Sequence, residues 1–546
     1  ALLLMVSWWA TGRQALAIPP GSGSFEWDDQ TGQSDPDKPL TVEYFRPDMV
    51  QADTPVWIIM HGVNRNAADY RDYFQAAAAA QGALVIAPQF DTTDWPGSVG
   101  YALGNIADAE SGGTPIDEQD WSFSKIEPLF DYLVDTLEPA IEADSYSMFG
   151  HSAGSQFVHR FLTWKPEARV NLAVAANAGW YTTPQFNNGG YPYDFPYSLS
   201  DTPTPAPFPV EQLTGALDNR LVVLLGDQDI LQGPNFRTTD AANAQGDTRF
   251  SRGQFYYSEG KAEATARNVP FGWDMMFVRG VGHSGSKMAK SAANLFRFAV
   301  EGPPPPIVDF LFDDAVGTTL DAAVDVAGGL SWSNALPGVA TDGAGVLQVA
   351  FTNTGPQDAG IQLPAQQVID GNANDFARMI VDIEPWVLLG EAYDEEIRFG
   401  FGNTSETDVT AQVWMDRVEV GPSLGKIRLR ARAEGGGGSD SGWIELFDFA
   451  GIDPLRIILD LDKAGDTFEV RYQLGDETEY VFFDGTVAPD RVGSFLRLGF
   501  DGTFDDPGDS FGISRYQVLV VPEPSSVMTV LTLVLVLTLG ARVVNS

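Results

Sequence analysis

Runs of apolar residues alternate with amphipathic stretches through the first 300 residues, and this alternation predicts a mostly parallel β-sheet with helices on both faces. The apolar runs predict strands at Val56–Met60, Leu84–Pro88, Tyr146–Phe149, Asn171–Ala176, Leu221–Leu225 and Asp274–Val278. Helical spacing predicts helices at Asp69–Gln81, Ser122–Leu137, Ala153–Trp164 and Lys287–Phe298. Three long insertions interrupt the alternation, at Asp91–Asp120, Tyr181–Pro209 and Leu231–Gly260. Loops of this length in a compact domain are usually functional.

The pattern changes after Gly302, where four consecutive prolines at 303–306 predict a stiff extended linker. Beyond them the helical period disappears, and apolar residues alternate with polar ones between Gly, Asp and Pro turns. Strands are predicted at Glu396–Gly402, Lys426–Ala433, Arg456–Asp462, Phe468–Leu474, Phe495–Phe500 and Ile513–Val521. We therefore expect an α/β domain at residues 18–302 and an all-β sandwich or jelly roll at residues 307–520.

The first residues have the character of a secretory signal peptide. Ala1–Ala10 is apolar, and Ala15-Leu16-Ala17 is a small-x-small cleavage pattern, so residues 1–17 are expected to be a signal peptide that lacks its basic start. A buried N-terminal helix is the alternative.

Composition excludes several classes of chemistry. The chain has no cysteine, which excludes a cysteine nucleophile and thiolate metal sites. Its formal charge of −41 would repel nucleic acid, so no nucleic-acid partner is expected. Such acidity suits solubility in salty surroundings or the binding of divalent cations, although a solvated acidic surface is the favoured explanation.

A nucleophile motif lies between one predicted strand and one predicted helix. Gly150-His151-Ser152-Ala153-Gly154 follows the strand Tyr146–Phe149 and opens the helix Ala153–Trp164. This G-x-S-x-G pattern places a serine on a tight turn, where its hydroxyl stands clear of the sheet. Ser152 is therefore the expected nucleophile.

A serine nucleophile needs a base, and the chain has only four histidines. His283 follows the predicted strand Asp274–Val278 in a Gly-rich loop, the place where an α/β sheet presents functional side chains. It is the expected base. The carboxylate partner is expected directly after the strand Leu221–Leu225, where Asp229 is favoured and Asp227 remains the alternative.

The chain order Ser152, Asp229, His283 is the order of the α/β-hydrolase family, and the run His61-Gly62-Val63-Asn64 after a strand also resembles that family. The resemblance, which covers about residues 39–300, implies an oxyanion hole made by the N–H groups of Val63 and Ala153. It also implies that Gly62 lets the backbone approach the substrate and that His61 supports the loop.

Within that family the chain resembles secreted esterases of the polyhydroxybutyrate-depolymerase and feruloyl-esterase type. The markers are Ile59–Asn64, Ala87–Phe90 and Ala178–Tyr181. Trp180 and Tyr181 are expected to bind substrate, in an aromatic loop over 180–208 that forms a rim or lid for an apolar or aromatic acyl group. The alternative is a loop packed down by its own aromatic side chains.

The C-terminal residues 521–546 resemble the PEP-CTERM sorting signal of Gram-negative bacteria. Pro522-Glu523-Pro524 precedes an apolar run, Val527–Gly540, and a single basic residue, Arg542. The resemblance implies an exosortase-type processing enzyme, transient membrane anchoring and release at the cell surface. An ordinary C-terminal transmembrane anchor is the alternative.

The all-β region resembles the concanavalin-like sandwiches of exported bacterial enzymes, and an extracellular polysaccharide is a possible partner. Trp386, Trp414 and Trp443 could stack on sugars or could be core residues, and the acidic turn Asp501–Asp509 could hold Ca²⁺.

Together these observations predict an exported serine hydrolase that cleaves small or polymeric carboxylic esters without a metal or organic cofactor. A peptidase or acyltransferase on the same fold is one alternative. The other is a surface-matrix or carbohydrate-binding protein whose hydrolase domain is degenerate.

Overall fold

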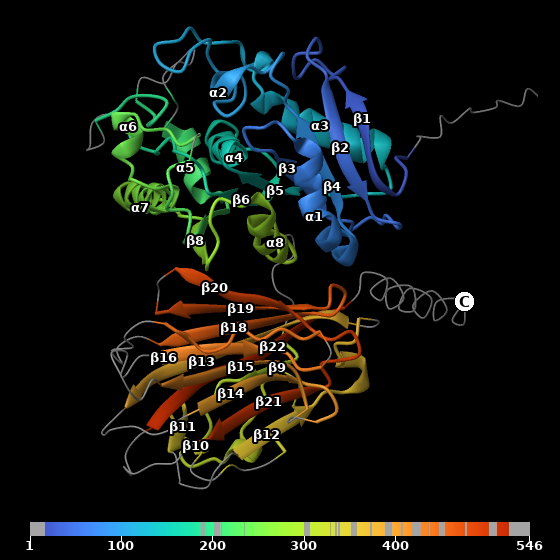
Figure 1. The fold of residues 1–546 in the computed structure, drawn as a ribbon, viewed down its shortest axis with the longest axis vertical. Coiled ribbons are helices and arrows are strands. Elements are labelled where there is room, and N and C mark those ends of the chain that lie inside the picture. The colour runs from blue at the N-terminus through green and yellow to red at the C-terminus, as the bar shows by residue number, and fades with distance from the viewer. Residues whose placement is uncertain are drawn as a thin grey trace, which may run out of the picture. The chain divides into compact units, whose positions relative to one another are not determined.

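The structure is a computed structural model, shown in Figure 1. It describes residues 17–186, 192–200, 208, 210–233, 235–299, 306–327, 329–333, 336, 339–350, 357–371, 374–387, 396–405, 408–417, 427–435, 437–446, 454–475, 478–501 and 510–522. The expected signal peptide except Ala17, most of the proline linker, the acidic turn after Asp501 and the sorting signal after Pro522 lie outside these residues. The chain forms two compact units, one drawn from residues up to Val300 and one mainly from later residues. Two short segments, Leu225–Gln228 and Met275–Val281, group with the second unit.

A mostly parallel sheet forms the centre of the α/β region, with the strand order β1-β2-β4-β3-β5-β6-β7-β8. The strands are β1 (Gly21–Trp27), β2 (Leu40–Arg46), β3 (Val56–Met60), β4 (Leu84–Gln89), β5 (Tyr146–His151), β6 (Val170–Ala176), β7 (Leu221–Gly226) and β8 (Trp273–Val278). The pairs β3–β4, β3–β5, β5–β6 and β6–β7 are parallel, whereas β1–β2 and β2–β4 are antiparallel. The six predicted strands are present, and β1 and β2 add an antiparallel edge that the pattern did not predict.

The α-helices are α1 (Ala67–Gln81), α2 (Gly97–Gly100), α3 (Ile126–Tyr132), α4 (Ala153–Trp164), α5 (Val210–Asp218), α6 (Asp240–Asn243), α7 (Arg249–Arg267) and α8 (Gly285–Phe296). Short turns of 3-10 helix, η1 (Glu118–Asp120) and η2 (Phe123–Lys125), and a π turn, η3 (Leu133–Leu137), surround α3. The predicted single helix Ser122–Leu137 is therefore three successive elements. α1 packs on α8, and α4 packs on α5.

The structure corrects the prediction of a long loop at Leu231–Gly260, because much of this segment is helical. It contains α6, and α7 starts at Arg249. The side chain of Thr248 accepts the Ser251 N–H at 3.0 Å, and the side chain of Ser251 accepts the Thr248 N–H at 3.0 Å. This reciprocal capping box starts the helix at a defined residue.

Aromatic side chains fix the strands that carry the site against the helices α1 and α8. The ring of Phe74 on α1 lies 6.0 Å from Trp57 on β3, 5.0 Å from Phe149 on β5 and 6.0 Å from Phe296 on α8. All four side chains are buried. Burial of large aromatic area of this kind holds the ends of β3 and β5 in fixed positions.

The second unit contains two antiparallel sheets. One has the order β20-β19-β18-β13-β22-β11-β10 with β9 beside β22, and the other has the order β12-β21-β14-β15-β16-β17. The strands are β9 (Val308–Phe310), β10 (Val339–Thr341), β11 (Leu347–Ala350), β12 (Gln357–Gln362), β13 (Asn374–Val387), β14 (Glu396–Gly402), β15 (Val409–Arg417), β16 (Ile427–Arg432), β17 (Ile444–Glu445), β18 (Leu455–Asp462), β19 (Thr467–Leu474), β20 (Glu479–Thr486), β21 (Phe495–Asp501) and β22 (Ser510–Pro522). Two 3-10 turns, η4 (Leu320–Ala322) and η5 (Ala365–Gln367), lie between them. The six strands predicted here are present.

Alternation along the strands builds the core of this β-rich unit. On β16, Ile427, Leu429 and Ala431 are buried, whereas the intervening arginines are partly exposed. Trp414 and Trp443 are partly exposed with ring centres 6.2 Å apart, and the side chain of Trp386 lies outside the described residues. Within the described part of the chain, no group of acidic or histidine side chains is arranged to hold a metal ion. No helix among the described residues has the length and apolarity needed to cross a membrane.

Candidate active site

The turn at Ser152 joins β5 to α4 and depends on two glycines. Ser152 has φ 58° and ψ −114°, a conformation that side-chain-bearing residues rarely adopt. A methyl group on Gly150 would collide with the carbonyl of Gly154, and one on Gly154 would collide with the carbonyl of Met60. The strand and helix therefore approach too closely for any other residue, as the motif requires.

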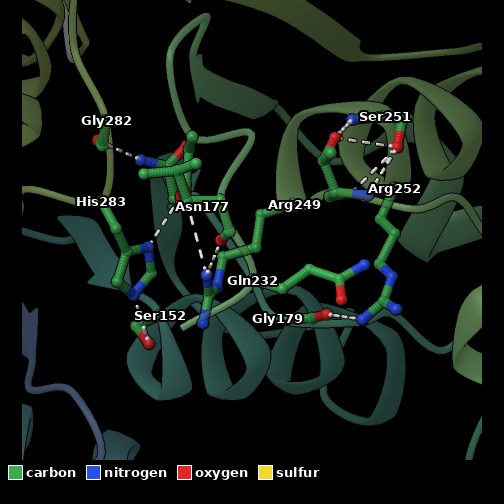
Figure 2. Close-up of polar contacts among 12 residues, drawn as sticks. Ser152, Asn177, Gly179, Gln232, Arg249, Ser251, Arg252, Gly282 and His283 are labelled. Carbon is green, nitrogen blue, oxygen red and sulfur yellow. Dashed lines mark hydrogen bonds and ion pairs between the residues drawn. The ribbon is translucent and has the colours of Figure 1, made fainter. Parts of the chain in front are cut away.

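The structure brings Ser152, His283 and Asp229 into one hydrogen-bonded chain. His283 Nε2 lies 3.1 Å from Ser152 Oγ, and His283 Nδ1 lies 2.7 Å from Asp229 Oδ2. Figure 2 shows His283 beside Ser152, with dashed lines marking its polar contacts. Asp229 is 2% exposed, while the His283 side chain is 32% exposed. A carboxylate at Nδ1 selects the tautomer in which Nε2 is free to accept the serine proton.

Asp227 has a different position from Asp229. Its Oδ1 accepts the N–H of Gly280 at 2.7 Å, and its own N–H donates to Val278 O at 3.2 Å. Asp227 therefore ties together the loops that follow β7 and β8. Of the two aspartates that the sequence offered, the structure places Asp229 within hydrogen-bonding distance of His283.

The loop after β3 forms a tight turn in which Val63 follows the first residue, Gly62. The Arg65 N–H donates to Gly62 O at 3.1 Å, which closes a turn over Val63 and Asn64. Ala153 is the first residue of α4, where backbone N–H groups have no partner within the helix. The two residues predicted to form the oxyanion hole thus lie on the turns beside the nucleophile.

His61 supports this loop from inside the protein. It is fully buried, its Nδ1 lies 3.0 Å from Gly62 O, and its Nε2 accepts the Phe90 N–H at 3.0 Å. Its ring stacks on Tyr101 at 4.6 Å, and the Tyr101 hydroxyl donates to His61 O at 2.8 Å. Burial lowers the pKa of His61 to about 3, so the imidazole is neutral and uses both nitrogens in hydrogen bonds.

His151, the residue before the nucleophile, lies against the base. Its ring centre is 4.5 Å from that of His283, and its Nδ1 lies 2.9 Å from the Tyr70 hydroxyl. Burial holds the pKa of His151 well below its usual value, so this histidine is neutral. The contact of Tyr70 with the elbow was missed because Tyr70 is 81 residues away in sequence.

Trp180 and Tyr181 are buried, which does not fit the expected direct contact with substrate. Trp180 lies between the guanidinium groups of Arg160, at 4.2 Å, and Arg237, at 4.4 Å. Tyr181 is 0% exposed and stacks on Tyr256 at 4.5 Å. Trp180 also lies 5.0 Å from Tyr197 of the same loop, so the described part of 180–208 supports the alternative interpretation, a loop packed by its own aromatic side chains.

Exposed apolar side chains lie next to residues of the site in the sequence or in contact with its loops. Val63 follows the oxyanion loop glycine, and Ile230 and Leu231 follow Asp229, with exposures of 48%, 49% and 77%. Tyr73, also partly exposed, lies beside Gly285, two residues after His283. We call Val63, Tyr73, Ile230 and Leu231 the apolar rim.

The sheet and this site together are typical of the α/β class of serine hydrolases. In a comparison with solved structures, poly(aspartic acid) hydrolase-1 from Sphingomonas sp. KT-1 is 36% identical, with a match that covers 51% of this chain and 99% of that chain at a TM-score of 0.46. The poly(3-hydroxybutyrate) depolymerase LpqC from Bordetella parapertussis is 33% identical, and the match covers 51% of this chain and 90% of that chain at a TM-score of 0.46. No protein-family model and no curated protein matches the chain. Identity above 30% over nearly the whole length of both enzymes shows that this chain belongs to their family of α/β hydrolases.

Proposed function

We propose that this protein hydrolyses carboxylic esters with Ser152 as nucleophile, His283 as base and Asp229 as its carboxylate partner. The observation that carries the proposal is the continuous hydrogen-bonded chain from Ser152 Oγ through His283 to the buried Asp229. Such a chain activates a serine hydroxyl, which alone is a weak nucleophile.

In the proposed reaction, Ser152 Oγ attacks the ester carbonyl while His283 Nε2 takes its proton. The N–H groups of Val63 and Ala153 stabilise the negative charge that develops on the carbonyl oxygen. His283 then returns the proton to the leaving alcohol, and an acyl group remains on Ser152. Water, activated by the same histidine, releases the acid and restores the serine.

The surroundings of the site favour a neutral, apolar acyl group. The apolar rim offers dispersion contacts, and the chain carries a formal charge of −41, which would repel an acidic substrate. A second candidate is amide hydrolysis, because one relative is named as a hydrolase of poly(aspartic acid), which is a polyamide. That polymer is also anionic, so the apolar rim and the charge favour the ester.

The test compares wild type with Ser152→Ala on paired p-nitrophenyl esters and anilides of graded acyl length. Wild type is expected to prefer esters, and the variant is expected to lose on the order of 10⁶-fold in turnover. A fluorophosphonate probe is expected to label wild type at Ser152 and to leave the variant unlabelled. Labelling that persists in the variant, or a preference for anilides, would contradict the proposal.

Export and surface processing are proposed on sequence grounds alone. The apolar start, Pro522-Glu523-Pro524, the apolar run Val527–Gly540 and Arg542 support an exported enzyme that an exosortase-type enzyme releases at the cell surface. Mass spectrometry of protein from the native cell is expected to find a chain starting near Ile18 and ending near Pro524. An intact tail in cells that possess an exosortase would favour an ordinary anchor. An extracellular polysaccharide remains the proposed partner of the β-rich unit, and retention on immobilised polysaccharide would test it.

A further inference from the structure

The carboxylate of Asp229 has a second charged partner besides His283. Its Oδ2 faces His283, while its Oδ1 lies 3.5 Å from Nη1 of Arg249. Side-chain exposures are 2% for Asp229 and 5% for Arg249. A buried carboxylate between an imidazole and a guanidinium interacts with both more strongly than it would in bulk water, because burial reduces screening.

We propose that Arg249 is a positioning residue for the reaction: its guanidinium holds the Asp229 carboxylate in the orientation that receives the His283 N–H. This inference rests on the proposed function, because it assigns a role relative to the same nucleophile and base.

Arg249 is itself held in place by the start of α7. It is the first helical residue after the N-cap Thr248, and Figure 2 shows it in the same group of contacts as Ser152 and His283. Its Nη1 also approaches Leu231 O at 3.5 Å, and the N–H of Phe250 approaches Asp229 O at 3.4 Å. The first turn of α7 therefore contacts the loop after β7 at two residues, Asp229 and Leu231.

The ring of Phe236 completes this arrangement. It lies 5.1 Å from the Arg249 guanidinium, a contact that favours the charged group without neutralising it. Asp229 is the acidic group that the Arg249 guanidinium contacts.

The sign of the electrostatic effect follows from the groups around His283. Asp229, Ser152 and the neutral His151 face its ring, and Arg249 stands behind Asp229. A guanidinium at this position opposes a positive charge on the imidazole. Removing the charge should move the acidic limb of the pH–activity profile upward, by about 0.5 to 1 pH unit for partly screened charges.

The experiment measures kcat/KM against pH for a soluble p-nitrophenyl ester, with active enzyme counted by fluorophosphonate titration. The variants are R249M and R249Q, which remove the charge, and R249K, which keeps it. R252M is the matched control, because Arg252 lies on the same helix, is fully buried, and donates to the carbonyls of Gly246, Gly179 and Arg237.

The neutral variants are expected to shift the acidic limb upward by about 0.5 to 1 pH unit and to lower kcat at high pH about tenfold. R249K should return the limb to within about 0.2 unit of wild type. R252M should lower the melting temperature without moving the limb. An unshifted limb in folded R249M or R249Q would overturn the proposal, as would a failure of both to fold while R252M folds.

A failure of the proposed role of Arg249 can be distinguished from a failure of the ester-hydrolase assignment. If wild type turns over no ester, the pH dependence of fluorophosphonate labelling at Ser152 replaces turnover, since it depends on the same base. A shifted labelling profile in R249M would then support the role of Arg249 although the substrate class is wrong.

Discussion

At the scale of single residues, Asp229 and Asp227 differ by what their carboxylates accept. Asp229 accepts from His283, whereas Asp227 accepts from the Gly280 backbone. Asp229→Asn should lower kcat roughly 10⁴-fold, because an amide favours the wrong histidine tautomer. Asp227→Asn should lower kcat only about tenfold, since one backbone hydrogen bond weakens. Steady-state kinetics on the ester used for wild type would check this, and the reverse ranking would move the proposed role to Asp227.

The principal residues of the site could be predicted because each directly follows a strand of the α/β pattern. Ser152, Asp229 and His283 come after β5, β7 and β8, and parallel strands bring such loops to one edge of a sheet. Arg249 and Tyr70 could not be predicted, because nothing in the local sequence tells which loop a side chain on a distant helix reaches. The capping pattern Thr248-x-x-Ser251 would have located the start of α7, yet not the target of its first side chain.

At the scale of elements, the support of the oxyanion loop depends on a histidine that stays neutral. The pKa of His61 in the folded protein is about 3, against an ordinary value of 6.5, because burial disfavours the charged ring. Between these values the unfolded chain binds more protons, so the stability contributed by neutral His61 is present above about pH 6.5 and is lost as pH falls.

His61→Gln keeps one donor and one acceptor but cannot be protonated. The variant should therefore show a weaker loss of stability between about pH 6 and 4, with the slope of unfolding free energy lowered by up to about 1.4 kcal/mol per pH unit. Urea unfolding at several pH values would measure it. His61→Ala is the contrasting variant, expected to lose activity at neutral pH because the loop loses both hydrogen bonds. Equal acid sensitivity in wild type and His61→Gln would contradict the burial argument.

Elements with strong apolar patterning were predictable, and those without it were not. The five-residue run of β3 is buried throughout and was found with its observed bounds. β1 was missed because Gly21–Trp27 contains small and polar residues, and six of its seven residues are partly or fully exposed at the edge of the sheet. α7 was missed because its aromatic and polar residues gave no clear apolar face in an apparent insertion.

At the scale of the whole molecule, the features proposed for catalysis all fall within the first 300 residues. Two family members match about half of this chain while the match covers 99% and 90% of their own lengths. Residues 18–302, the predicted hydrolase domain, are a similar share of the 546 residues.

We therefore expect a fragment of residues 18–302 to fold and to hydrolyse soluble p-nitrophenyl esters with kcat/KM within about threefold of the full chain, since a family fold with its own core needs no second domain. Circular dichroism, a single thermal transition and fluorophosphonate titration would establish that the fragment is folded and active. The same fragment carrying Ser152→Ala is the control for background hydrolysis. An insoluble or inactive fragment beside an active full chain would show that the segments Leu225–Gln228 and Met275–Val281, which group with the second unit, need that unit to fold. The boundary at residue 302 would then be wrong, while the assignment of Ser152, tested in the full chain, would stand.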